Sequence, residues 1–135
     1  MTAAASTPVQ VVYLDTSAAV KLISDERESD GLRSYLDEGM AVVSSDLLET
    51  ELRRIGMRHR IDQVLITAVL DGVTLTPLTR DQFRKAGLYP QVGLRSLDAL
   101  HLAGALGIEA AAILTYDTRL AEAARANGLK VVAPE

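Results

Sequence analysis

The sequence predicts an α/β domain built on a mainly parallel sheet of about five strands. Short apolar runs alternate with longer amphipathic segments along the chain, a pattern typical of strands connected by helices. The first run, Val9–Leu14, is apolar at nearly every position, which favours a strand buried on both faces. We therefore expect this strand to lie in the middle of the sheet.

The expected elements alternate in a regular order. The predicted strands are Val9–Leu14, Ala41–Ser44, Val73–Thr76, Ala111–Thr115 and Leu129–Val132. The predicted helices are Thr16–Ile23, Glu26–Glu38, Ser45–Arg58, Arg60–Leu70, Thr79–Leu88, Leu97–Leu106 and Asp117–Asn127. Ser96 is expected to cap the sixth helix, after a loop over Tyr89–Arg95 that carries Pro90 and Gly93.

Length and composition indicate a single domain over residues 9–135. A chain of 135 residues with 48% apolar residues can bury a real core. Residues 1–8 are small and polar, so we interpret them as a frayed tail rather than a signal peptide. There is no Cys, and no apolar run approaches the ~18 residues of a membrane span. We expect a soluble cytoplasmic domain without a membrane partner.

The charge pattern leaves the question of nucleic-acid binding open. A net charge of −4 argues against a protein that holds nucleic acid over its whole surface. Basic residues nevertheless gather over residues 53–60. This cluster fits a solvated helix face, a rim that contacts phosphates, or a docking surface for an acidic partner. Its members are Arg53, Arg54, Arg58, His59 and Arg60.

Four carboxylates are candidates for a shared site. Asp15 and Asp117 follow the first and fourth predicted strands, whose carboxyl ends would lie at one edge of a parallel sheet. Glu51 and Asp98 lie within predicted helices that could reach the same edge. Acids that share a pocket repel one another, so such a cluster indicates a divalent cation, and Mg²⁺ prefers oxygen ligands.

Each acid also has a structural interpretation. Asp15 and Asp117 stand where an Asp commonly caps a helix, and Asp98 would benefit from a helix dipole. Glu51 borders the apolar stripe of its helix, but Glu49 competes with it two residues away. The functional interpretation therefore depends on the four acids as a set.

Four segments of the chain resemble the PIN-domain ribonucleases, and especially the VapC-type toxins of bacterial toxin–antitoxin pairs. They are VVYLDTSAAVKL (distinctive over 12–22), SSDLLETELRR (44–54), LRSLDALHLAGAL (94–106) and LTYDTRLAEAARANGL (114–129). The resemblance extends over nearly the whole chain. It implies a PIN-like fold, a three-layer α/β/α sandwich.

The resemblance also implies a set of acids that hold Mg²⁺ or Mn²⁺. These are Asp15, Glu51 rather than Glu49, Asp98 and Asp117. Thr115 stands where some relatives carry a fifth acid, so we expect one tightly held ion.

The activity implied is that of a metal-dependent endoribonuclease that hydrolyses RNA and inhibits translation and growth. Asp15, Asp98 and Asp117 would be the metal ligands. Glu51 would orient or deprotonate the attacking water, or hold a second ion. Hydroxyl groups expected to support these acids are those of Thr16, Ser17 and Thr115.

Other residues near these motifs have weaker predicted roles. Arg95, Arg53 and Arg54 are candidates for RNA contacts. His101 is expected to be a packed histidine bonded to backbone or to a nearby acid, rather than a metal ligand. Tyr89 and Tyr116 are structural residues or stack on a base.

The resemblance implies a VapB-type antitoxin as the cognate partner. It also implies a homodimer, or a heterotetramer or larger assembly with the antitoxin. The sequence leaves two other classes open. One is a phosphotransfer domain, either a receiver or a haloacid-dehalogenase-like phosphatase, although Ser17 stands where the phosphatase pattern has its second acid. The other is a non-catalytic interaction module whose acids are only helix caps.

Overall fold

The computed structural model describes residues 9–135, and the expected tail over residues 1–8 lies outside the described residues. A five-stranded parallel sheet forms the centre, with strand order β3-β2-β1-β4-β5. The strands are β1 (Val11–Leu14), β2 (Ala41–Ser45), β3 (Thr74–Thr76), β4 (Ala112–Leu114) and β5 (Val131–Val132). The predicted fold class and the central position of the first strand are confirmed.

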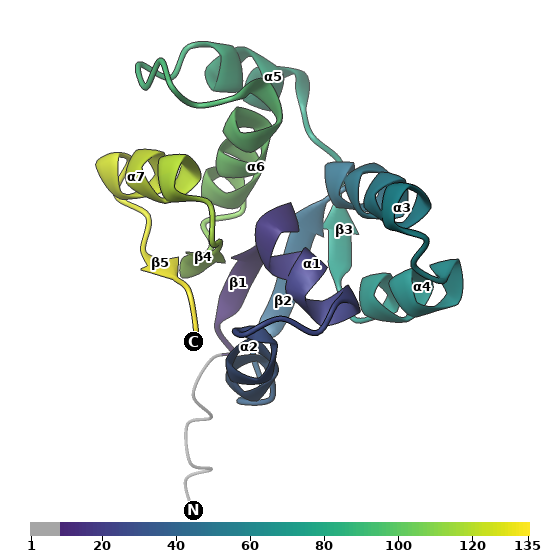
Figure 1. Cartoon of the computed structure of the whole chain (residues 1–135). Helices are drawn as coiled ribbons and strands as arrows, with labels where there is room; N and C mark the ends of the chain where they lie inside the picture. The colour runs from purple at the N-terminus through teal and green to yellow at the C-terminus, as the bar shows by residue number, and fades with distance from the viewer. Residues whose placement is uncertain (1–8) are drawn as a thin grey trace, which may run out of the picture.

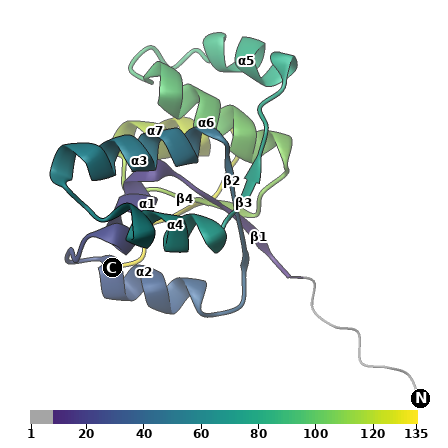
Figure 2. The same ribbon diagram turned by 90° about the vertical axis from the view of Figure 1, so that its right-hand side faces the viewer.

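Helices cover both faces of this sheet. They are α1 (Thr16–Ile23), α2 (Ser29–Leu36), α3 (Leu47–His59), α4 (Gln63–Asp71), α5 (Arg80–Gly87), α6 (Ser96–Gly107) and α7 (Thr118–Ala126). Helices α1–α4 lie on one side of the sheet, and α6 and α7 lie on the other, as Figures 1 and 2 show. Helix α5 packs on the outer side of α6. The result is a three-layer α/β/α sandwich.

Alternating side chains of β1 build the two halves of the core. Val12 and Leu14 belong to the apolar cluster under α1–α4, whereas Tyr13 belongs to the cluster under α6 and α7. This alternation follows from the two-residue period of a strand. Tyr13 is thereby directed toward the helix that carries Asp98 and His101.

The order of the strands creates one switch point, between β1 and β4. The chain first builds β1, β2 and β3 toward one edge and then crosses over to add β4 and β5 on the opposite side. Ligands of open α/β sheets bind outside the carboxyl ends of the strands at such a point. Asp15 and the segment Thr115–Asp117 follow the two strands that meet there.

Two local predictions were wrong. Ser96 is the first residue of α6 rather than its cap, since Arg95 occupies the N-cap position and makes no side-chain capping bond. Helix α2 begins at Ser29 instead of Glu26. The Ser29 hydroxyl accepts a bond from the Glu26 amide and donates to the Ser24 carbonyl, which holds this segment in a turn.

Side-chain caps begin α4 and α5. Asp62 caps α4 through the Val64 amide, and Thr79 and Gln82 form a capping box at the start of α5. Arg60 adopts a left-handed conformation at the end of α3, which turns the chain back into α4. Within residues 9–135, none of the helices has the length and apolar character needed to cross a membrane.

Candidate functional site

Asp15 is buried at the end of β1 and is held by two hydroxyl groups. Its Oδ2 accepts hydrogen bonds from Ser17 Oγ at 2.7 Å and from Thr115 Oγ1 at 2.9 Å. The Ser17 amide also donates to Oδ2, so Asp15 is an N-cap of α1, as its structural interpretation predicts. The other oxygen, Oδ1, lies 4.0 Å from His101 Nε2. One oxygen of Asp15 therefore serves the fold, and the other faces the neighbouring site residues.

Asp117 divides its two oxygens in the same way. Its Oδ1 accepts the Leu120 amide at 2.8 Å and caps α7, while Oδ2 lies 4.0 Å from the guanidinium of Arg95. Thr115 links the two strand ends, because its hydroxyl accepts the Asp117 amide and donates to Asp15. Capping and site formation are thus compatible in both acids.

Asp98 lies in the first turn of α6, near the charges of Asp15 and Asp117. Burial, followed by the charges of Asp15 and Asp117, raises the pKa of Asp98 to about 6. The charges of His101 and Arg95 oppose this rise without cancelling it, and Arg95, at 3.9 Å, is 72% exposed. The Asp98 carboxylate therefore remains poorly compensated by the protein.

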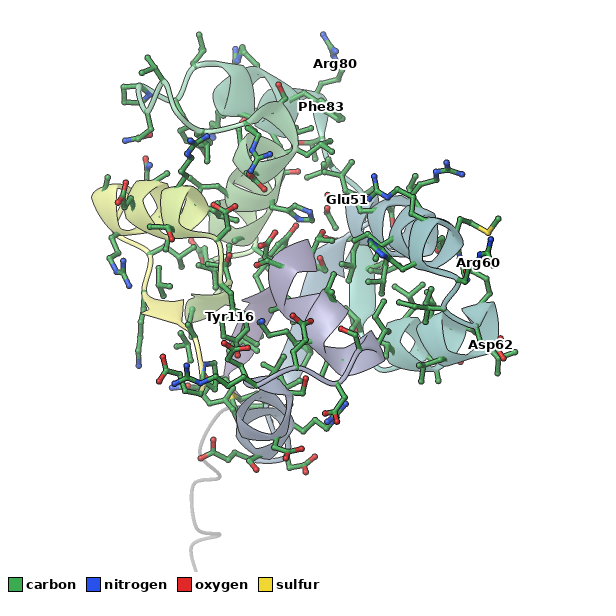
Figure 3. All side chains as sticks on the ribbon, in the orientation of Figure 1. Glu51, Arg60, Asp62, Arg80, Phe83 and Tyr116 are labelled. Carbon is green, nitrogen blue, oxygen red and sulfur yellow. The ribbon has the colours of Figure 1, made fainter. Side chains whose placement is uncertain are left out.

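Glu51 extends from α3 toward α6, as Figure 3 shows, and is bonded by two side chains. Its Oε1 lies 2.6 Å from His101 Nε2 and accepts the Thr16 hydroxyl at 3.0 Å. Glu49 instead pairs with Arg53 on the exposed side of the helix. The geometry thus brings Glu51, and not Glu49, to the site.

His101 is fully buried and has the packed role expected for it. Burial by itself would lower the pKa of His101. The bond to Glu51 and the charges of Asp15, Glu51 and Asp98 outweigh burial, and its pKa is raised above the ordinary value.

The four acids occupy one neighbourhood at the switch point, connected through shared partners. His101 lies beside Asp15 and Glu51, Arg95 lies beside Asp98 and Asp117, and Thr115 connects Asp15 with Asp117. In the part of the chain that the structure describes, no three acid or histidine side chains converge closely enough to hold one metal ion directly. Mg²⁺ usually keeps several waters and takes one or two carboxylates, so this all-oxygen donor set fits a hydrated ion.

The predicted RNA-contact residues differ in their availability. Arg53 is held by Glu49, Gln63 and Thr67, so contact with RNA would compete with those bonds. Arg54 is exposed on α3, and Arg95 is exposed beside Asp98. Their RNA contacts remain predictions.

Tyr116 has the contacts of a structural residue. Its hydroxyl donates to the Pro134 carbonyl at 2.6 Å, and the Lys21 ammonium lies over its ring. It lies beside α1 and β4 in Figure 3. Tyr89 is half-buried and packs between α5, the loop before α6 and α7.

The sequence interpretation missed Tyr13. Its hydroxyl lies 2.7 Å from His101 Nδ1, and burial raises the pKa of Tyr13 to about 12. One signal was present: a tyrosine inside an apolar central strand must find a hydrogen-bond partner for its hydroxyl.

Comparison with known sequences identifies relatives of this chain. The PIN domain family model matches residues 12–126. Ribonuclease VapC35 of Mycobacterium tuberculosis is 42% identical over 135 residues, covering 92% of this chain and 97% of the relative. The alignment thus extends over nearly all of both proteins.

Solved structures show the same fold at low sequence identity. Mycobacterium tuberculosis VapC20, described as a sarcin–ricin loop cleaving toxin, superposes with a TM-score of 0.73 at 16% identity, over 91% of this chain and 99% of the other. A toxin–antitoxin complex from Klebsiella pneumoniae gives 0.71 at 21% identity, over 92% and 98%. From the matching family model and the extended identity, this chain belongs to the PIN-domain family and, within it, to the VapC ribonucleases.

Proposed function

We propose that this chain is a divalent-metal-dependent endoribonuclease that acts as the toxin of a toxin–antitoxin pair, hydrolysing RNA and inhibiting translation and growth. The observation that carries the proposal is the acid centre at the β1–β4 switch point. Burial and two neighbouring carboxylates raise the pKa of Asp98 there to about 6, so the centre favours binding of a cation. The relatives named as ribonucleases support the same activity.

Asp15, Asp98 and Asp117 would hold Mg²⁺ or Mn²⁺, directly or through water. When bound, the ion supplies positive charge at the scissile phosphate and makes a water molecule more acidic. Ser17 and Thr115 fix Asp15 through Oδ2, and the Leu120 amide fixes Asp117 through Oδ1. Asp15 Oδ1 and Asp117 Oδ2 would then be the oxygens that face the ion or its waters.

Glu51 would orient the attacking water or accept its proton. Its Oε1 is occupied by His101 and Thr16, whereas no group among residues 9–135 donates a hydrogen bond to Oε2. Oε2 is therefore the oxygen that can receive a water proton. A second ion held by Glu51 is the competing role.

Arg95 and Arg54 would contact the RNA backbone from the rim of the centre. Arg95 is exposed and stands 3.9–4.0 Å from Asp98 and Asp117, so it can exchange these weak contacts for a phosphate. Arg53 would contribute less, because its guanidinium already binds three side chains.

A VapB-type antitoxin is the proposed cognate partner, on the ground of the structural likeness to the Klebsiella pneumoniae toxin–antitoxin complex. We propose a homodimer, or a heterotetramer or larger assembly with the antitoxin. The proposed location is the cytoplasm, where RNA is available and a chain without Cys needs no oxidising compartment.

The test is RNA cleavage by the purified full chain after treatment with EDTA. Cleavage should be absent in EDTA, return with Mg²⁺ or Mn²⁺, and be lost in Asp98→Asn. Sequencing the RNA ends formed after induction in cells, with Asp15→Asn as the control, would identify the substrate and site. Cleavage that persists in EDTA, or at the wild-type rate in Asp98→Asn, would contradict the proposal.

A further inference from the structure

A chain of hydrogen bonds runs from the core of the protein to Glu51. The Ser45 amide donates to the Tyr13 hydroxyl at 3.2 Å, and that hydroxyl lies 2.7 Å from His101 Nδ1. His101 Nε2 lies 2.6 Å from Glu51 Oε1. Tyr13 and His101 are both 0% exposed, so solvent does not compete for these bonds. This series of hydrogen bonds connects β2, β1, α6 and α3, four elements that are far apart in the sequence.

The Glu51 carboxylate sets the direction of these bonds. A carboxylate can only accept, so Nε2 of the neutral imidazole carries the proton and donates to Glu51. Nδ1 is then an acceptor for the Tyr13 proton, while the Tyr13 hydroxyl accepts the Ser45 amide. A second proton on the ring would reverse only the contact with Tyr13. In either state Nε2–H points at Glu51.

Simple core filling does not account for this arrangement. Burying a hydroxyl and an imidazole is unfavourable unless every polar group is bonded, and apolar side chains would fill the same volume without that requirement. Here the bonds end on a site acid, and the same Nε2 lies 4.0 Å from Asp15 Oδ1. The polar pair is thus directed toward the acid centre.

We infer that Tyr13 and His101 are positioning residues that hold Glu51 through Oε1 and leave Oε2 for the attacking water. Thr16 adds the second bond to Oε1 at 3.0 Å. The inference rests on the proposed ribonuclease function. It assigns to Glu51 the role of handling the water rather than that of a metal ligand, because the protein already bonds one of its oxygens twice.

Two substitutions of His101 test the contributions of its two ring nitrogens separately. In His101→Gln the amide nitrogen reaches the position of Nε2 and can still donate to Glu51, whereas in His101→Asn it reaches only the position of Nδ1. Single-turnover cleavage should fall by ~10–100-fold in His101→Asn and in Tyr13→Phe, with RNA affinity nearly unchanged. His101→Gln should recover most of the rate.

A matched control removes a hydroxyl elsewhere. Tyr35→Phe changes a half-buried tyrosine in α2, away from the centre, and should leave the rate unchanged. All rates are compared below the melting temperature of every variant, so that folded protein is measured. Equal rates in His101→Gln and His101→Asn, or a wild-type rate in Tyr13→Phe, would overturn the inference.

A second measurement does not depend on activity. The chain has two histidines, so nitrogen-15 spectra of the metal-free protein separate buried His101 from exposed His59. We expect His101 to show a protonated, strongly hydrogen-bonded Nε2 whose signal shifts in Glu51→Ala, while His59 stays constant. An unshifted His101 signal would overturn the hydrogen-bond chain. Absence of wild-type cleavage, in contrast, would overturn the proposed function without changing this spectrum.

Discussion

The two halves of the acid centre are stabilised in different ways. On one half, Glu51 is bonded at 2.6 Å by His101, which is itself bonded at 2.7 Å by Tyr13, and both partners are fully buried. On the other half, the basic side chain that pairs with Asp98 and Asp117 is the exposed Arg95, at 3.9 and 4.0 Å. We call these the bonded half and the open half.

Under the proposed function, the difference predicts which part of the centre would depend on a cation. The bonded half holds its carboxylate with the protein's own donors, so its geometry exists before anything binds. The open half has a surplus of negative charge, visible in the raised pKa of Asp98, and exposed ion pairs compensate such charge only weakly. A metal ion would therefore complete the open half and leave the bonded half nearly unchanged.

The largest expected effect comes from comparing Asp98→Asn with Asp15→Asn. Both should reduce RNA cleavage at least ~100-fold, about 2.7 kcal/mol of transition-state stabilisation. Only Asp15→Asn should also lower the free energy of unfolding, by about 2 kcal/mol, because Asp15 accepts buried bonds from Ser17 and Thr115. Chemical denaturation in EDTA measures this difference, and equal destabilisation by both variants would show that Asp98 is held by the protein as firmly as Asp15.

The pH dependence of stability tests whether the Asp98 charge destabilises the metal-free protein. Because the folded-state pKa of Asp98 is raised from 3.8 to about 6, the metal-free protein loses stability as the pH rises through this window. Asp98→Asn should therefore melt at a higher temperature than the wild type at neutral pH in EDTA. That advantage should vanish below about pH 4, where the wild-type carboxyl is protonated in both states.

An intermediate effect is expected on the stabilisation of the folded protein by bound Mg²⁺. Mg²⁺ at ~100 times its dissociation constant should stabilise the wild type by about 2.7 kcal/mol. Asp98→Asn and Asp117→Asn should lose most of this gain, whereas Glu51→Gln should keep it. Thermal melts with and without Mg²⁺ test the assignment, and loss of the gain in Glu51→Gln would place the ion on the bonded half.

The smallest expected effect concerns the arginines at the rim. Arg95→Gln should weaken RNA binding modestly and reduce the slope of affinity against salt by ~1, as for one phosphate contact. Arg53→Gln, its control, should leave that slope unchanged and cause a small loss of stability, because Arg53 binds Gln63 and Thr67. Binding titrations at several salt concentrations, made without metal, compare the two. A larger change in slope for Arg53→Gln would assign the phosphate contact to Arg53 instead of Arg95.

The sequence by itself determined the fold class, the strand-to-helix junctions at Asp15 and Asp117, and a candidate set of four acids. Local rules suffice there, because apolar alternation and capping depend on residues close together in the chain. The predicted helix start at Glu26 and the Ser96 cap were wrong, since Ser29 and Arg95 take those positions through local backbone bonds and dihedral angles that composition does not reveal.

Only the tertiary structure decided how the acids share their partners. Tyr13, Glu51 and His101 are separated by up to 88 residues, and no local pattern couples them. They meet because β1 lies beside β4 and because α3 and α6 converge on the end of α1 from opposite sides of the sheet. The same packing left Asp98 near Asp15 and Asp117 with little compensation. Sequence identified the carboxylates, and long-range packing set which is bonded by buried side chains and which is left with little compensating charge.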